Sequence, residues 1–453
     1  MTNQQLAEYW NVSQGLPLLN QARFAEAEAC FRQALRCNPS YAEAYNNLGA
    51  ARAKQGDLQG ALACFQKVVQ LRPDFADGFF NLGLMFARTG QRDQAVACHQ
   101  ETVRLNPEHA EAHTYLALHW LMHGNYVQGW PALAWRWHRA GVLAPPSRKP
   151  SWDGAPLHGR TILLHADAGL GEIPPVPLLY RSFGDAGFGD TLQFVRYAPL
   201  VQQRGGNVVV LCQRPLVRLL SGGAGIDLVA GPESALPDFE FQIPFMDLPG
   251  VMGTTLATVP ANIPYLKPEP ELVQQWRHEL SPVPGFKVGI VWQGNRSFQY
   301  DVDRSVELPQ FEPLARLPGI RLFSLQVGAG AEHVASASFP ITDLAGRFDP
   351  ACFRDAAAAM MALDLVITID SAPAHLAGAL GVPVWTLLPF NSDFRWLLER
   401  EDSPWYPTMR LFRQRRPGEW APVFQRLEDA LREVSDSPSA CSAPQMRGLA
   451  APQ

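Results

Sequence analysis

The sequence has little net charge and lacks the segments typical of membrane or secreted proteins. Its 38 basic and 43 acidic side chains leave a formal charge of −5, which argues against a nucleic-acid or anionic membrane surface as the main partner. No apolar run reaches the roughly 18 residues of a membrane span. The first ten residues also lack the basic and apolar regions of a signal peptide. We therefore expect a cytoplasmic protein that binds neither nucleic acid nor membrane.

The seven cysteines include no CxxC pair, so they give no sign of a zinc or redox motif. Cys30, Cys64 and Cys98 follow one another at intervals of 34 residues. Equivalent positions in stacked repeats lie about 10 Å apart, too far to share a metal ion or form a disulfide. We interpret these three cysteines as residues that fill the same buried position in successive repeats.

The same 34-residue period governs the first third of the chain. The residues that recur are small or end helices: Gly15, Gly49 and Gly83; Ala27, Ala61 and Ala95; Pro39, Pro73 and Pro107. This pattern is typical of tetratricopeptide repeats, in which small residues let two helices approach closely and proline ends the second helix. Residues 1–141 are therefore expected to form an all-α solenoid of about four repeats that serves as a recognition scaffold.

The fourth repeat is unusually rich in tryptophan, with Trp120, Trp130, Trp135 and Trp137. A terminal repeat that docks on another domain is often atypical. We therefore favour interdomain packing for this cluster over a ligand-binding cage.

The remainder of the chain alternates short apolar runs with helical segments. After a Pro- and Gly-rich linker at 142–160, one set of about four runs lies within 161–264 and a second set within 285–434. Continuous apolar strands separated by helices indicate parallel sheets covered on both faces. We expect an α/β region of two Rossmann-like lobes that face a cleft, followed by a disordered tail at 435–453.

The clearest candidate loop follows the apolar run that ends at Asp370. Ser371 can cap the next helix, and Pro373 suits its first turn. The amides and dipole at a helix start attract anions, and Ser371 and His375 would lie there one turn apart. A diphosphate fits this arrangement, and so does a plain capped helix with a packed histidine.

A second loop spans residues 185–199. Gly187 and Gly189 allow a close backbone approach, and Asp190 opens a helix. An aspartate in this place could be a general base in the cleft or only a favourable charge in the first turn.

A third polar loop spans residues 291–308. Its Arg304 could neutralise a leaving phosphate, or could belong to a solvated loop. Asp301 and Asp303 have D-x-D spacing, but they precede an arginine rather than a strand end. We interpret them as loop charges and expect no metal site.

Five segments together resemble the tetratricopeptide-repeat proteins with a glycosyltransferase family 9 (heptosyltransferase-like) catalytic region: GFGDTLQFVRYAP, VGIVWQGN…DRSVEL, LFSLQ, LDLVITIDSAPAHLAGALGVPVW and DFRWLLEREDSPWYPTMRLFRQ. The resemblance covers nearly the whole chain. It implies a GT-B fold whose second lobe holds a nucleotide-sugar donor in a bacterial-type enzyme. It also implies an inverting, metal-independent transfer with no cofactor besides that co-substrate.

The resemblance also assigns site residues. Asp190 occupies the place of the presumed base in the family's G-D-x-L pattern. The residues expected around the diphosphate belong to the D-[ST]-[AG]-x-x-H pattern or to neighbouring loops: Asp370, Ser371, Ala372, His375, Arg304 and Gln326. The acceptor-side candidates follow or precede Asp190 directly: Gly189, Gln193 and Arg196. The heptosyltransferases place a lysine where this chain offers Arg304, so a heptose preference stays open.

The loop that carries the base occurs twice, as DAGLGE at 167–172 and DAGFGD at 185–190. Only Asp190 is followed by a matching helix, because Glu172 runs into Pro174 and Pro175, which cannot continue one. We therefore assign the base to Asp190 rather than to Glu172 or Asp167.

Three functions stay open at this point. The first is a glycosyltransferase whose repeats present a protein, peptide or glycan acceptor on their concave face. The second is a protein O-glycosyltransferase of the O-GlcNAc type, which would modify Ser or Thr side chains. The third is a non-catalytic interaction scaffold, which the doubled loop favours.

Overall fold

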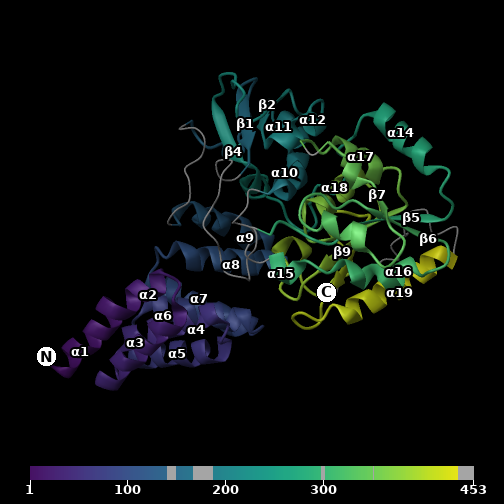
Figure 1. Ribbon diagram of the computed structural model, residues 1–453. Coiled ribbons are helices and arrows are strands. Elements are labelled where there is room, and N and C mark those ends of the chain that lie inside the picture. The colour runs from purple at the N-terminus through teal and green to yellow at the C-terminus, as the bar shows by residue number, and fades with distance from the viewer. Residues whose placement is uncertain (140–148, 167–186, 297–300, 350, 437–453) are drawn as a thin grey trace. The chain divides into compact units, whose positions relative to one another are not determined.

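The computed structural model describes residues 1–139, 149–166, 187–296, 301–349 and 351–436 (Figure 1). Residues 142–148 of the expected linker and almost all of the expected tail lie outside these ranges. The chain divides into two compact units. The first comprises residues 1–120 and 131–140, and the second comprises residues 121–130 and most of the chain after residue 140.

The first unit is built from consecutive helices. A π-helical turn, Tyr9–Gly15, interrupts its first helix. The helices run as α1 (Asn3–Glu8), α2 (Leu16–Asn20), α3 (Phe24–Cys37), α4 (Ala42–Gln55), α5 (Leu58–Leu71), α6 (Ala76–Arg88), α7 (Arg92–Leu105), α8 (Ala110–Met122) and α9 (Tyr126–Leu133). α8 and α9 cross the boundary between the units. The helical solenoid predicted from the 34-residue period is confirmed.

The repeated small residues explain why these helices pair. A Cβ atom at Gly49 would lie 2.8 Å from the ring of Phe65, and one at Gly15 would lie 2.3 Å from the ring of Phe31. Only glycine admits such a close approach between a first and a second helix. The helix α5 ends at Leu71, two residues before Pro73, and α3 and α7 end at the same offset from their prolines.

The second unit contains two parallel sheets. The first has the strand order β3-β2-β1-β4, and the second has the order β10-β9-β8-β5-β6-β7. The strands of the first sheet are β1 (Thr161–His165), β2 (Asn207–Leu211), β3 (Leu228–Ala230) and β4 (Phe241–Pro244). Those of the second are β5 (Phe286–Val291), β6 (Ile320–Ser324), β7 (Thr342–Asp343), β8 (Leu365–Ile369), β9 (Val384–Leu388) and β10 (Met409–Arg413). The predicted parallel α/β architecture with two lobes is confirmed.

Helices cover both sheets, as expected for parallel strands. All residues of β8 and β9 are buried. The covering helices are α10 (Phe188–Phe194), α11 (Ala198–Gln202), α12 (Val217–Leu220), α13 (Leu248–Val251), α14 (Pro270–Leu280), α15 (Asp301–Arg304), α16 (Glu312–Ala315), α17 (Arg354–Met360), α18 (Ala372–Leu380) and α19 (Ala421–Asp436) (Figure 1). A large cluster of buried side chains around Trp292, Phe311 and Phe424 forms the core of the second lobe.

The tryptophans of the fourth repeat divide between the units. Trp130 is buried in the second unit, where it meets the rings of Phe394 and Trp405 edge-on at 5.7 and 6.4 Å. Trp135 stacks on His113 in the first unit, with ring centroids 4.0 Å apart. Trp130 therefore has a packing role and does not form part of a ligand cage.

Candidate functional site

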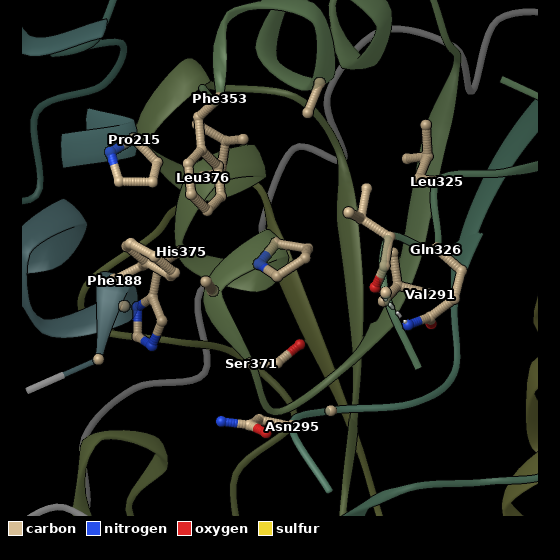
Figure 2. A pocket seen from close by; sticks show the side chains of 18 of the residues that line it. Phe188, Pro215, Val291, Asn295, Leu325, Gln326, Phe353, Ser371, His375 and Leu376 are labelled. Atoms are coloured by element: carbon tan, nitrogen blue, oxygen red, sulfur yellow. Dashed lines mark hydrogen bonds between the residues drawn. The ribbon is translucent and has the colours of Figure 1, made fainter. Parts of the chain in front are cut away.

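A cleft of about 620 Å³ lies in the second unit, where several parallel strands end (Figure 2). Residues that follow β5, β6 and β8 line one side, and residues that follow β2 or begin α10 line the other. Both lobes therefore contribute to one cavity. This is where ligands bind in open α/β sheets, because the strand-to-helix loops meet there.

The start of α18 lies in this cleft. Ser371 stands at the N-cap position in an extended conformation, as predicted, but its hydroxyl donates a hydrogen bond to the carbonyl oxygen of Ile369 at 3.3 Å. The Ser371 side chain itself does not cap this first turn. The positive end of the helix is therefore directed at the cavity, which Asp370, Ser371 and Ala372 line.

His375 lies on the same helix, also in the cleft wall (Figure 2). It is 5% exposed, its Nδ1 lies 2.9 Å from the Tyr406 hydroxyl, and its ring stacks on Trp396. Burial, together with the charges of Arg395 and Arg196, holds the pKa of His375 well below its usual value. The neutral imidazole can contribute a hydrogen bond to a bound anion, but no positive charge.

Gly189 faces this histidine from α10. A Cβ atom at position 189 would lie 2.8 Å from His375 Cδ2. Any other residue here would push into the imidazole, so the glycine allows the two lobes to approach. Gly189 lines the cleft, as expected of an acceptor-side residue.

Arg304 reaches the cleft from α15. Its Nη1 donates to the carbonyl oxygen of Asp370 at 3.0 Å, and its Nε donates to Asp301 at 2.9 Å. Asp301 is 4% exposed and also accepts a hydrogen bond from the Ser305 hydroxyl at 2.8 Å. The interpretation of Asp301 as a loop charge is therefore wrong, because this residue begins α15 and its buried carboxylate orients Arg304 beside the start of α18.

Gln326 uses its polar atoms to hold the loops that line the cleft. Its Oε1 accepts from the backbone N–H groups of Trp292 and Gln293, both at 3.0 Å, and its Nε2 donates to the carbonyl oxygen of Ala329 at 2.8 Å. The side chain lies in the cavity wall (Figure 2). It therefore shapes the site and has little capacity left to bind a donor.

Asp190 lies in the first turn of α10, and its side chain is 14% exposed. It lines the same cleft as Ser371. Arg395, which follows β9 in the other lobe, donates from Nη2 to Asp190 Oδ1. The sequence offered no signal for this partner, because the two residues are 205 positions apart.

Gln193 and Arg196 were expected on the acceptor side, but the structure does not bring them to the cleft. Both are buried. Gln193 Oε1 accepts from Arg395 Nε at 2.5 Å. Arg196 donates to the Trp405 carbonyl oxygen at 2.7 Å and to the Tyr265 hydroxyl at 2.9 Å. Only the first turn of α10 reaches the cavity, so Gln193 and Arg196 pack behind the cleft wall and do not line it. Glu172 and Asp167 lie outside the described residues.

Apolar side chains form another part of the cleft wall. Phe188 and Phe353 meet edge-on, with ring centroids 5.0 Å apart, and Pro215 and Leu376 lie beside them (Figure 2). Such a surface suits the apolar faces of a sugar or a nucleobase better than a charged group.

In the ranges that the structure describes, no three His, Cys, Asp or Glu side chains are grouped so as to hold a metal ion. None of the helices in those ranges combines the length and apolarity needed to cross a bilayer.

Fold and cleft together describe a protein of helical repeats joined to a two-lobed α/β region, with a cleft at the start of α18. Two family models match the chain: tetratricopeptide repeat, over residues 13–76 and 80–129, and glycosyltransferase family 9 (heptosyltransferase), over residues 326–396. The chain is therefore similar to tetratricopeptide-repeat proteins within residues 13–129 and to glycosyltransferase family 9 over residues 326–396.

The chain is 29% identical to Protein FlbA of Caulobacter vibrioides over 450 residues, which are 96% of this chain and 68% of that protein. Similar solved structures include MamA, at 20% identity and a TM-score of 0.28, over 29% of this chain and 77% of that chain. They also include MamA from Desulfovibrio magneticus RS-1, at 23% identity and a TM-score of 0.25, over 29% of this chain and 71% of that chain.

Proposed function

We propose that the second unit transfers a sugar from a nucleotide-sugar donor to an acceptor that the repeats recruit. The transfer inverts the anomeric centre, requires no metal and takes place in the cytoplasm. The acceptor is a protein, a peptide or a glycan that binds to the concave face of the repeats. One observation supports the proposal above all: a single cleft carries the start of α18 from one lobe and a carboxylate, Asp190, from the other.

The donor diphosphate binds at the start of α18 in this proposal. The helix dipole and the His375 imidazole supply fixed dipoles, and the Arg304 guanidinium supplies a charge that Asp301 orients. Such groups stabilise negative charge best when they need no rearrangement during the reaction. The Ser371 hydroxyl is the one group that turns, from the Ile369 carbonyl oxygen to a phosphate oxygen, when the donor binds.

Asp190 acts as the general base. It removes the proton from the acceptor hydroxyl while that oxygen attacks the anomeric carbon from the face opposite the diphosphate. The new glycosidic bond forms as the bond to the diphosphate breaks, which inverts the anomeric centre. For this step the carboxylate must come within about 3 Å of the hydroxyl.

A panel of nucleotide sugars and their free nucleoside diphosphates tests the proposal by thermal shift. A ligand of the folded state stabilises it by about 2.7 kcal/mol when present at 100 times its Kd. We expect at least one nucleotide sugar and its nucleoside diphosphate to raise the Tm, whereas the free sugar, which lacks the diphosphate, leaves it unchanged. A panel in which no nucleotide raises the Tm contradicts the proposal.

A further inference from the structure

Arg395 is a charged residue buried between the two lobes. Its side chain is 4% exposed, and its guanidinium reaches both lobes at once. On the side of its own lobe it donates from Nη1 to Asp393 at 3.0 Å. On the side of the first lobe it donates to Asp190 and to Gln193. All three nitrogen atoms of the guanidinium therefore have acceptors.

The turn that carries Arg395 fixes its direction. Asp393 Oδ1 also accepts from the backbone N–H of Arg395 at 2.9 Å. The guanidinium lies between the rings of Phe394 and Phe194, at 4.7 and 5.3 Å from their centroids. Backbone, side chain and ring contacts together restrict Arg395 to this one orientation.

The charges around Arg395 keep it ionised. Burial alone would lower its pKa, but the carboxylates of Asp393 and Asp190 outweigh burial and raise it. Asp370, which follows β8, acts in the same direction, and the nearby His375 is neutral. Carboxylates from three chain segments thus surround the Arg395 guanidinium.

We propose that Arg395 is a positioning residue, which holds the Asp190 carboxylate ionised and directed into the cleft from across the lobes. The inference rests on the proposed function, in which Asp190 is the base. It follows that the base is in place only when the two lobes are together. Arg395 does not touch the reacting atoms in this account, and acts through Asp190 alone.

The test compares Arg395→Gln, Arg395→Lys and a control, Arg400→Gln. Arg400 pairs with Asp402 at 2.5 Å in the same chain segment, but neither residue lines the cleft. The readouts are release of nucleoside diphosphate from the nucleotide sugar that raises the Tm, the pH profile of kcat, donor Kd and Tm.

We expect Arg395→Gln to lower kcat at least 10-fold and to move the acidic limb of its pH profile upward by about 1 pH unit or more, because a cation in contact with the carboxylate is lost. Donor Kd should not change. Arg395→Lys, which keeps the charge, should restore most of the pH profile and part of kcat. The control should match the wild type.

The proposal is wrong if Arg395→Gln lowers only the Tm and leaves kcat and its pH profile unchanged. If Arg395→Gln does not fold, the kcat of Arg395→Lys decides instead. A lysine keeps the charge but cannot reproduce the three contacts of the guanidinium, so a wild-type kcat in this variant also contradicts the proposal. Asp190→Asn separates this outcome from failure of the proposed function. If Asp190→Asn releases nucleoside diphosphate as fast as the wild type, Asp190 is not the base and both ideas fail. No release by the wild type also contradicts both.

Discussion

At the scale of single residues, local patterns predicted the start of α18 and missed the contacts made across the chain. Ser371 could be placed in the cleft wall because it stands where an apolar run meets a helix, and Asp190 because a glycine-containing loop and the G-D-x-L pattern lead into a helix. The hydrogen bonds of Arg196 could not be predicted, because its partner Trp405 is 209 residues away. Arg395 was missed for the same reason, since nothing near it in the sequence marks a cross-lobe partner.

The Ser371 hydroxyl should contribute directly to donor binding. Ser371→Ala removes a donor that can turn from the Ile369 carbonyl oxygen to a phosphate oxygen. We expect nucleoside diphosphate binding to weaken by about 1–3 kcal/mol, the usual effect of losing a hydrogen bond to a charged group. Titration calorimetry measures this change.

Ser281→Ala provides the matched control. The Ser281 hydroxyl also donates to a backbone carbonyl oxygen, that of His278, but it lies at the end of α14 and outside the cleft. Its removal should leave the affinity unchanged. Equal affinities in wild type and Ser371→Ala would remove Ser371 from the donor site.

At the scale of helices and strands, most elements could be predicted because their signals are local. Glycine and proline at the 34-residue period marked where helices pair and end, and long apolar runs marked the central strands. The strand β10 (Met409–Arg413) was missed because its two arginines, Arg410 and Arg413, interrupt the apolar run. The two-residue strand β7 is too short to leave a pattern. The π-helical turn Tyr9–Gly15 has no sequence rule that predicts it.

The third repeat carries a histidine where the two preceding repeats carry phenylalanine. His99 occupies the position of Phe31 and Phe65, and a Cβ atom at Gly83 would lie 2.6 Å from its ring. It is 1% exposed, and neither ring nitrogen has a hydrogen-bond partner among the described residues. Burial, with smaller effects from His109 and His119, lowers the pKa of His99 to about 3.

This pKa makes the repeats sensitive to acid. An unfolded histidine titrates near pH 6.5, so between pH 6.5 and 3 the unfolded chain binds a proton that the folded chain refuses. The free energy of unfolding is therefore not reduced by His99 well above pH 6.5, and it falls as the pH drops below that value. Because of His99, we expect the free energy of unfolding to be about 2 kcal/mol lower at pH 5 than at pH 7. Denaturant titrations at the two pH values measure it.

Reciprocal substitutions isolate this effect. His99→Phe should remove this part of the pH dependence, because phenylalanine does not titrate. The substitution should also fit, since phenylalanine occupies the equivalent position in the preceding repeats. Phe65→His should add a second loss of similar size. An identical pH dependence in wild type and His99→Phe would show that His99 does not control the acid stability.

At the scale of the whole molecule, the division into repeats and an α/β region followed from the sequence, because period 34 and alternating strands and helices are visible without contacts. The strand order and the cross-lobe cluster around Arg395 did not follow, since both depend on pairing between distant segments. The composition of the cleft explains why the sequence did not predict these features. Its chemistry comes from both lobes, and local patterns describe one segment at a time.

The most direct test of the account separates binding from turnover in Asp190→Asn. The amide keeps the size of the side chain but cannot accept the proton of an attacking hydroxyl. The account predicts that release of nucleoside diphosphate falls by ~10²-fold or more, within the range for losing a general base, while calorimetry shows an unchanged donor Kd. Turnover equal to that of the wild type would contradict the account, and so would a loss of donor binding that by itself explains the lower turnover.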